Sequence, residues 1–199
     1  MKHDIPILEF DGHSPAIIDP RANDVEGGLP EACVLCFFYD VLADLAEKGE
    51  LVKVGQLQTE NSPLPIYLYT DENGRKAAVM NPQVGAPLAA GVLEKMIVHG
   101  CSKIIAVGGA GSLVHDHDVT HLVIPTSAIR DEGVSYHYLP PSREVQPNAE
   151  GVTMLETILK KHDLPYVKSK TWTTSAYFRE TQDKREQRIA EGCTVVEME

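Results

Sequence analysis

A glycine-rich turn and a run of histidines and aspartates stand side by side in AVGGAGSLVHDHDVTH, residues 106–121. The glycines leave backbone N–H groups accessible, so that an anion or a sugar hydroxyl could approach them closely. Histidine and aspartate are side chains that bind metal ions. The stretch therefore raises two hypotheses: a phosphate or sugar site at Gly108–Gly111, and a metal site in the segment that follows.

The glycine turn follows SKIIAVGG, whose apolar run is typical of a buried strand. Ligands of α/β proteins usually bind at the carboxyl ends of such strands, which favours a binding role for the turn. A dinucleotide-binding loop would have a third glycine where Val114 stands, and a helix would follow it. Dinucleotide binding is therefore disfavoured, and a purely structural tight turn stays open as the alternative.

The metal hypothesis depends on the conformation of residues 115–121. On a strand, His115 and His117 would share a face, whereas on a helix His117 and His121 would do so. The segment lies between two predicted strands, where a polar loop is usually a solvated turn. We therefore expect no metal site and no cofactor.

The end of the chain carries a second group of residues suited to binding. Tyr177 and Phe178 directly follow a predicted strand, and Glu197 and Glu199 flank Met198 at the end of another. Aromatic rings can stack on flat bases, and carboxylates accept hydrogen bonds from sugar hydroxyls. The alternatives are an ordinary core pair and solvent-exposed glutamates. A serine nucleophile is disfavoured, because no Gly-x-Ser-x-Gly elbow occurs.

These residues depend on an alternation of strand-like and helix-like segments. The pattern predicts strands at 16–19, 65–69, 102–109, 121–130, 136–139, 166–173 and 193–198, with a further short apolar run at 76–81. It predicts helices at 31–50, 86–99, 149–164 and 179–192. Strands that alternate with helices favour an α/β fold with a parallel or mixed sheet and helices on both sides.

Length and composition set the broad class of the protein. A chain of 199 residues with 43% hydrophobic residues predicts one domain with a real core. Its net charge of −11 disfavours nucleic acid as a partner. No apolar run is long enough for a membrane helix and no signal peptide is evident, so we expect a cytoplasmic protein that does not enter membranes. We expect the four cysteines to be reduced, half-buried thiols, with a redox Cys-x-x-Cys at Cys33 and Cys36 as the alternative.

Taken in order, four segments resemble the nucleoside phosphorylase family, which includes purine nucleoside phosphorylases, uridine phosphorylases and nucleosidases. They are GAPLAAGVLEKMIVHGCSKIIAVGGAGSL, LVIPTSAIRDEGVSYHY, TTSAYFRET and EGCTVVEME. Together they span residues 85–199 of a single predicted domain, 1–199. Residues 1–80 are divergent, although IIDPRA at 17–22 resembles a worn form of the family's early phosphate loop.

The resemblance implies a three-layer α/β/α sandwich with a mixed central sheet. It also implies phosphorolysis of a purine or pyrimidine nucleoside to a free base and a pentose 1-phosphate, as in nucleoside salvage. Such enzymes bind phosphate beneath the sugar and stabilise a ribose that becomes cation-like as the glycosidic bond breaks. The partners implied are a nucleoside, phosphate as co-substrate, and copies of the same chain in a dimer, trimer or hexamer.

The resemblance also assigns roles to individual residues. The turn residues Gly108, Gly109, Ala110 and Gly111 would line the floor for phosphate and ribose. Tyr177 and Phe178 would stack on the base. Met198 would pack on the sugar, while Glu199 would accept hydrogen bonds from its 2′ and 3′ hydroxyls with support from Glu197.

Three departures from the family pattern keep other functions open. Ala106 stands where many phosphorylases have a phosphate-binding arginine, and Gly109 where a Ser or Thr is common. Arg21 or Arg130 would have to substitute, and Arg130 is equally suited to a structural ion pair. The family's general acid would lie beyond Glu199, so either the sequence is a fragment or the acid is missing. A hydrolytic nucleosidase and a catalytically inactive nucleoside-binding protein are therefore the alternatives, and the nucleobase stays open.

Overall fold

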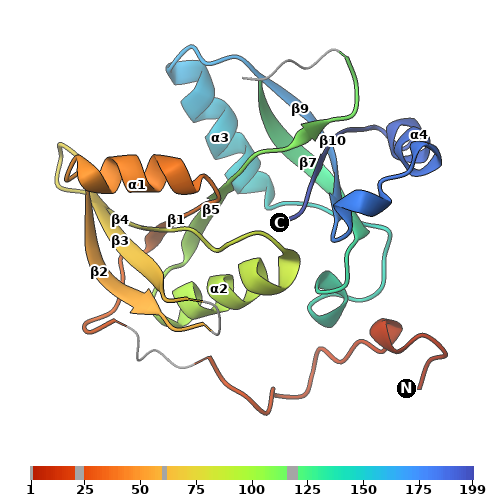
Figure 1. Cartoon of the computed structure of the whole chain (residues 1–199), viewed down its shortest axis with the longest axis horizontal. Helices are drawn as coiled ribbons and strands as arrows, with labels where there is room; N and C mark the ends of the chain where they lie inside the picture. Colours follow the sequence, from red (N-terminus) through yellow and green to blue (C-terminus); the bar gives the residue numbers. More distant parts are fainter. Residues whose placement is uncertain (1, 21–24, 60–61, 116–120) are drawn as a thin grey trace. The chain divides into compact units, whose positions relative to one another are not determined.

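The computed structural model describes residues 2–20, 25–59, 62–115 and 121–199. Within it the chain forms two compact units (Figure 1). Unit 1 comprises Met1–Ser14 and Ala110–Glu199, and unit 2 comprises Pro15–Gly109. Each unit has its own sheet and its own helices, so each is described by itself.

Unit 2 is built on a five-stranded mixed sheet in the order β2-β3-β4-β1-β5. Its strands are β1 (Ala32–Cys36), β2 (Leu51–Leu57), β3 (Leu64–Thr70), β4 (Lys76–Met80) and β5 (Lys103–Val107). Strand β1 runs parallel to both β4 and β5, whereas β2, β3 and β4 pair antiparallel. The helices are α1 (Tyr39–Glu47) and α2 (Ala86–Val98).

Two apolar clusters hold unit 2 together, one on each face of its sheet. Val92 and Met96 of α2 pack with Cys33 and Ile66 of the sheet. Helix α1 contributes Leu42 to a second cluster, which includes Cys36, Leu51 and Val79. Because successive side chains of a strand point to opposite faces, residues 33 and 36 of β1 face different helices.

Unit 1 is built on a second five-stranded mixed sheet, in the order β6-β10-β9-β7-β8. The strands are β6 (Gly111–Ser112), β7 (Leu122–Asp131), β8 (Glu144–Val145), β9 (Tyr166–Thr174) and β10 (Cys193–Glu197). The three long strands are parallel, and the two short edge strands pair antiparallel to them. Its helices are α3 (Ala149–Lys161) and α4 (Gln182–Ala190), with short 3-10 turns η1 (Pro6–Leu8), η2 (Ser135–His137) and η3 (Tyr177–Arg179).

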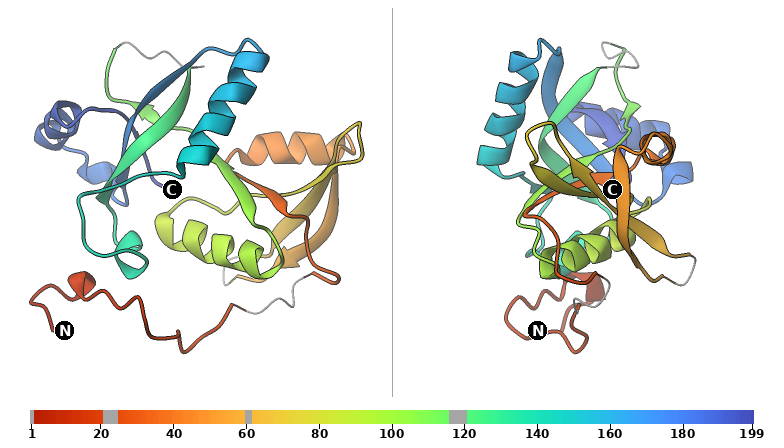
Figure 2. Two further views of the ribbon diagram at one scale, coloured as in Figure 1. Left: turned by 180° about the vertical axis from the view of Figure 1, so that it is seen from behind. Right: turned by 90° about the vertical axis from the view of Figure 1, so that its left-hand side faces the viewer.

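Helices α3 and α4 lie on opposite sides of the unit 1 sheet in each view (Figures 1 and 2). Both helices begin at a side-chain cap: Asn148 accepts a hydrogen bond from Gly151 N, and Thr181 accepts one from Lys184 N. The core between α4 and the sheet contains the fully buried Trp172 with Leu113, Ile129 and Val196. This packing holds the carboxyl ends of β7, β9 and β10 in one parallel row.

The α/β class with mixed sheets is confirmed, but three local predictions are wrong. Residues 31–50 form β1 and then α1, not one helix, because the apolar run of β1 packs on both faces and only the later part has helical spacing. Residues 136–139 form no strand: the first two belong to the turn η2 and the other two follow it.

Residues 16–19 form no strand either, and Ile17 and Ile18 are fully or largely exposed. The edge strand β2 was not predicted. The short edge strands β6 and β8 were not predicted either, whereas the other strands and helices lie close to the predicted segments, within a few residues at their ends.

All four cysteines are buried thiols without a disulfide. Cys33 and Cys36 belong to clusters on different faces of the sheet, which disfavours a redox pair between them. Burial, together with the neighbouring Cys101, raises the pKa of the Cys33 thiol to about 12. The Cys33 thiol is therefore a poor nucleophile at neutral pH.

Candidate functional site

The carboxyl end of β10 holds Glu197 in a defined orientation within unit 1. In the parallel register, Glu197 lies beside Thr173 of β9. The hydroxyls of Thr171 and Thr173 both donate hydrogen bonds to Glu197 Oε1, the first at 3.0 Å. Residues 171 and 173 share a face of β9 because strand side chains alternate. The two threonines thus orient one carboxylate at the end of the sheet.

Glu199 lies next to this carboxylate, and its backbone N–H donates to Glu197 Oε2 at 2.9 Å. Burial, and then the charge of Glu197, raise the pKa of Glu199 to about 7. Met198 is half-buried between the two glutamates. The pair therefore combines an oriented hydrogen-bond acceptor with a carboxyl group that changes its charge near neutral pH.

Gly111 lies on the strand next to these glutamates. It belongs to β6 and is paired with Val196 of β10, one residue before Glu197. A Cβ atom at Gly111 would approach Val196 Cγ1 to 3.2 Å, so the close pairing favours glycine here. The structure thus brings Gly111 beside Glu197 and Glu199, although the glycine and the glutamates are far apart in the sequence.

Tyr177 and Phe178 form an exposed aromatic pair on η3, which follows the end of β9. Their ring centroids are 4.2 Å apart. Tyr177 is 55% exposed and Phe178 is 88% exposed. Core packing therefore does not explain them, and the interpretation as an ordinary core pair is wrong. Exposed aromatic rings at the end of a sheet are suited to stacking on a planar ligand.

The other half of the glycine turn, Gly108 and Gly109, ends unit 2. It follows β5, next to the end of β1, and Phe37 N donates to Val107 O at 2.9 Å. A Cβ atom at Gly109 would lie 3.6 Å from Phe38 Cε1. Phe38 therefore lies against the turn, and Asp40 follows it in the first turn of α1. Ala110 and Gly111, in contrast, belong to unit 1.

Two arginines were candidates to replace the phosphate-binding arginine that is absent at position 106, and the structure describes only one of them, Arg130. Arg21 lies outside the described residues, so the phosphate role suggested for it and for the segment 17–22 stays a prediction. Arg130 is buried and stacks over the Tyr136 ring at 4.3 Å. Its guanidinium donates to oxygens of the next connection, namely Ser135, Leu139, Pro140 and Ser142. These contacts favour the structural role, with neutral partners instead of an ion pair.

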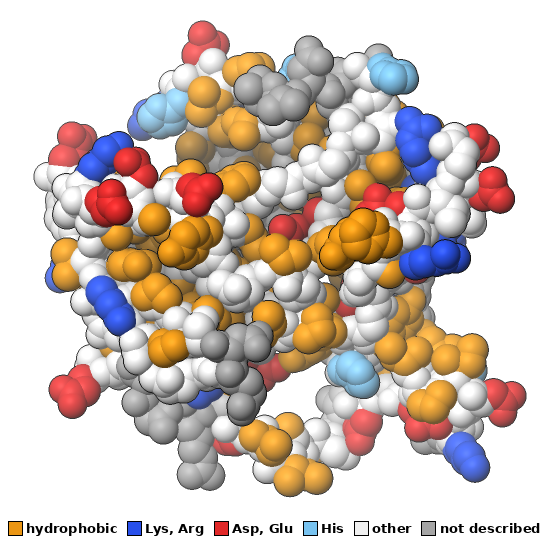
Figure 3. Space-filling view, viewed as in Figure 1, with side chains coloured by type: hydrophobic (Ala, Val, Ile, Leu, Met, Phe, Trp, Pro, Cys, Tyr) orange, Lys and Arg blue, Asp and Glu red, His pale blue; other side chains and the backbone are white. Residues whose placement is uncertain are grey.

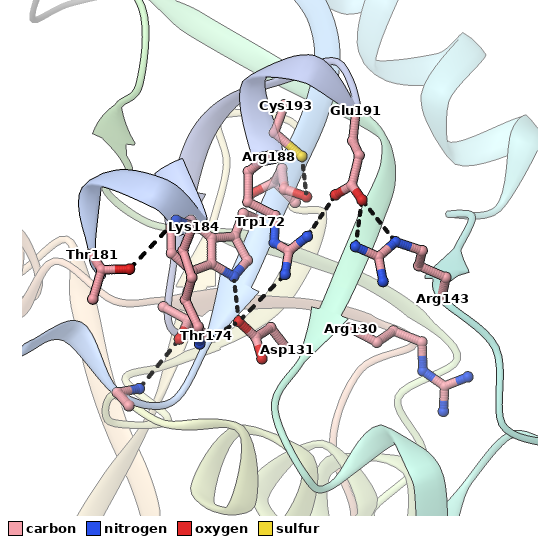
Figure 4. A network of polar contacts seen from close by, with 12 residues as sticks. Arg130, Asp131, Arg143, Trp172, Thr174, Thr181, Lys184, Arg188, Glu191 and Cys193 are labelled. Carbon is pink, nitrogen blue, oxygen red and sulfur yellow. Dashed lines mark hydrogen bonds and ion pairs between the residues drawn. The ribbon is translucent and has the colours of Figure 1, made fainter. Parts of the chain in front are cut away.

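A polar network surrounds Trp172 beneath α4 (Figure 4). Asp131, the last residue of β7, accepts a hydrogen bond from Trp172 Nε1 at 3.0 Å and lies 3.2 Å from Lys184 Nζ. Arg188 joins Asp131 at 3.9 Å and Glu191 at 2.6 Å, and Arg143 also pairs with Glu191. The network joins α4 to the ends of the sheet strands.

The segment predicted to be a polar connector is described only in part. His115 lies exposed in a turn after β6, whereas 116–120 lie outside the described residues. Among the residues that the structure does describe, no group of three His, Cys, Asp or Glu side chains is arranged to hold a metal ion. The same part of the chain contains no helix long and apolar enough to cross a membrane.

With this geometry in view, comparison with known proteins decides the family. The model of the phosphorylase superfamily matches residues 31–199. The chain belongs to the phosphorylase superfamily.

Two curated superfamily members are similar to this chain. Uridine phosphorylase from Haemophilus influenzae is 27% identical over 96 residues, which are 48% of this chain and 38% of that protein. Guanosine phosphorylase from Halorubrum lacusprofundi is 26% identical over 124 residues, 62% of this chain and 48% of that protein. The matched part of the chain spans less than half the length of either relative.

Solved structures of superfamily members share the fold. Uridine phosphorylase from Vibrio fischeri superposes with a TM-score of 0.76 at 18% identity, covering 91% of this chain and 74% of that one. The 5′-methylthioadenosine/S-adenosyl homocysteine nucleosidase of Helicobacter pylori superposes with a TM-score of 0.67 at 16% identity, covering 86% and 75%. The superfamily fold is thus shared with both phosphorylases and nucleosidases.

Sequence reasoning missed several residues that the structure describes, one of them in unit 2 and the others in unit 1. Thr171 and Thr173 carry a usable signal, because hydroxyls two residues apart on a strand share one face. Phe38 was hidden by the wrong helix prediction for 31–50. Asp131 and Trp172 are 41 residues apart in sequence, and no local pattern indicates that they meet.

Proposed function

We propose that this chain cleaves the N-glycosidic bond of a nucleoside, with phosphate as the acceptor of the pentose. The observation that carries the proposal is the carboxylate pair at the end of β10. Glu197 is oriented by Thr171 and Thr173, and Glu199 lies directly beside it. Two adjacent hydroxyls of a ribose are natural donors to such a pair.

In this proposal the residues of unit 1 bind the nucleoside. Glu199, in its ionised form, accepts hydrogen bonds from the 2′ and 3′ hydroxyls, and Met198 packs on the sugar. Tyr177 and Phe178 stack on the base. Holding the ribose and the base fixes the bond between them for attack, which lowers the entropic part of the barrier.

A carboxylate near the sugar also suits the charge that develops during the reaction. As the glycosidic bond lengthens, positive charge grows on the ribose, and a fixed negative group stabilises that charge more in the transition state than in the ground state. This scheme uses no metal ion and no organic cofactor. That the chain needs neither stays a prediction.

Phosphate as acceptor is supported by the phosphorylases among the curated relatives. It is proposed to bind at the backbone N–H groups of Gly108 and Gly109. The alternative acceptor is water, and a specific observation favours it. Phe38 lies against Gly109, so that an aromatic ring packs on this turn, and Ala106 stands where many phosphorylases have an arginine. Neither side chain supplies the positive charge that favours binding of an anion.

The test is to incubate the chain with uridine, guanosine and other nucleosides, with and without inorganic phosphate. The free base released is measured by chromatography. Phosphate-dependent release with formation of a pentose 1-phosphate would support phosphorolysis. Release at the same rate without phosphate would assign the chain to the hydrolytic nucleosidases. Absence of release under both conditions would contradict the proposed activity.

A matched pair of variants sharpens the test. Glu197→Gln removes the oriented charge, whereas Glu144→Gln removes a carboxylate that pairs with Lys170 on the same sheet. Only the first is expected to lose base release, by roughly 100-fold or more, as expected for loss of a fixed group that stabilises transition-state charge.

A further inference from the structure

The connection between β9 and α4, residues 175–181, carries the two aromatic side chains that the proposed function assigns to the base. Core packing does not fix these rings, because both residues are more than half exposed. Their position depends instead on the two ends of the connection. Thr174 Oγ1 accepts a hydrogen bond from Ala176 N at 3.3 Å, and Thr181 Oγ1 caps α4 by accepting one from Lys184 N at 3.4 Å.

The first end of the connection is part of the sheet, whereas the second moves with α4. Helix α4 is short, and its sequence QDKREQRIA is strongly polar. Only a narrow apolar face, including Ile189, packs against the core. Polar contacts must therefore contribute to fixing the helix, and Figure 4 shows where they converge.

Two cations of α4 meet at Asp131, whereas Arg185 of the same helix donates to Leu113 O. The Asp131 carboxylate lies at the end of β7, directly beside Thr174 in the strand register. The oxygen Oδ2 accepts the Trp172 Nε1 hydrogen bond at 3.0 Å and pairs with Lys184 Nζ at 3.2 Å. Arg188 Nη2 lies 3.9 Å from the same oxygen. One carboxylate thus joins the sheet end, the buried indole and two cations of α4.

Arg188 is a buried cation that needs the negative charge of Asp131 and Glu191. The residue is only 7% exposed, and its guanidinium carbon lies 5.6 Å from the centre of the Trp172 ring. Its Nη1 pairs with Glu191 at 2.6 Å, while its Nε has no hydrogen-bond partner among the described residues. A buried cation is costly without opposite charge nearby. Asp131 and Glu191 together supply that charge and hold Arg188 beneath α4.

We propose that Asp131 is a positioning residue for the aromatic pair Tyr177–Phe178. By pairing with Lys184 in the first turn of α4 and Arg188 in its last turn, it fixes α4 against the ends of β7 and β9, and thereby fixes the connection that bears the rings. The proposal rests on the proposed function for the identity of the ligand. The mechanical part, that Asp131 orders residues 175–181, stands on the contacts alone.

The first experiment is hydrogen exchange of the backbone amides of residues 175–181 in the full chain. Asp131→Asn keeps the size of the side chain and an acceptor for Trp172 but removes the charge. Exchange is expected to become about tenfold faster in this variant. Lys184→Met should also make the exchange of these backbone amides faster. The matched control is Lys168→Met, which breaks the surface pair with Glu156 at similar side-chain exposure, 46% against 42% for Lys184.

The second readout separates positioning from simple loss of folded protein. Asp131→Asn is expected to raise the KM for the nucleoside about fivefold or more, with kcat within about twofold. Partial unfolding would instead lower kcat through loss of active protein and leave KM unchanged. Lys168→Met should change neither constant.

Each outcome decides the proposal. Unchanged exchange in a folded Asp131→Asn variant, or faster exchange with an unchanged KM, would overturn it. If that variant does not fold, Lys184→Met compared with Lys168→Met decides in its place. If the wild-type chain releases no base from any nucleoside, the proposed function fails. The exchange measurement then still shows whether Asp131 orders the connection.

Discussion

At the scale of the residue, the carboxyl end of β10 shows how neighbours divide the roles of two similar side chains. Glu197 is held by two threonine hydroxyls, which stabilise its charge. Glu199 is buried beside that charge, and its pKa is raised to about 7. Glu197 is therefore an oriented hydrogen-bond acceptor, and Glu199 beside it changes its charge in the neutral range. This division produces two predictions.

The first prediction concerns pH and Glu199. A raised pKa means that the folded protein binds this proton more tightly than the unfolded chain does. The stabilisation is complete below the ordinary pKa of 4.5 and is lost as pH rises toward about 7. In urea unfolding, Glu199→Gln should therefore flatten the decline in stability across this window. The exposed Glu180→Gln should follow the wild type, and an unchanged decline in Glu199→Gln would refute the assignment.

The second prediction concerns Thr173. Thr173→Val keeps the shape of the side chain but removes one donor to Glu197, so the carboxylate is less well oriented. The KM for a nucleoside should rise about tenfold, the scale expected for a hydrogen bond to a charged group. Thr194→Val, which removes a hydroxyl that bonds Ser169 on the same sheet, should leave KM unchanged. Equal KM values in both variants would count against the role of Glu197.

At the scale of the element, buried polar groups hold in place the connections that follow the parallel strands β7 and β9. The connection after β9 carries the two aromatic residues proposed to bind the base. The connection after β7 is organised around Arg130, and Glu132 accepts hydrogen bonds from Val134 N and Ser135 N. The connection after β9 depends on the network around Asp131 and Arg188. In the first case a side chain of β7 fixes the connection that follows β7, and in the second a side chain at the end of β7 contacts the helix that follows the connection after β9.

The third prediction tests the connection after β7. Arg130→Met leaves several buried oxygens without their donor, so unfolding free energy should fall by about 2–4 kcal/mol in urea titrations. Arg143→Met breaks a more exposed pair with Glu191 and should cost less than about 1 kcal/mol. A phosphate role for Arg130 would instead predict loss of phosphate dependence with little change in stability.

At the scale of the whole molecule, charge limits the class of ligand. The chain has 29 acidic residues against 18 lysines and arginines. Figure 3 shows basic side chains scattered over the viewed face, not gathered into a patch. This distribution suits small ligands held by individual groups better than a polyanion held by a surface. Assembly into homo-oligomers and a cytoplasmic location stay predictions.

The fourth prediction separates an active enzyme from an inactive binding protein. A ligand that binds only the folded state stabilises it by about 2.7 kcal/mol at a concentration 100 times its Kd. Nucleosides should therefore raise the melting temperature of the chain, measured in calorimetry. A rise without any release of base would identify a binding protein. The absence of a rise with any nucleoside, base or phosphate would contradict both roles.

The sequence by itself determined the class of fold, most elements after residue 64, and the family. Long periodic segments such as 86–99 and 149–164 were predicted correctly, because their hydrophobic spacing reflects the face that each helix buries. The glycine turn and the two glutamates were singled out by residue type and position, and their binding roles came from the family resemblance and stay predictions. Local patterns of this kind depend only on neighbours in the chain.

The tertiary structure alone decided how distant residues meet. The strand β1 could not be separated from α1 by spacing, because a strand packed on both faces is apolar throughout. The pairing of Glu197 with Thr171 and Thr173 follows from the register of two parallel strands. The meeting of Asp131, Trp172 and Arg188 follows from the packing of α4 on the sheet. Such contacts are set by register and packing, and these become defined only when the chain is folded.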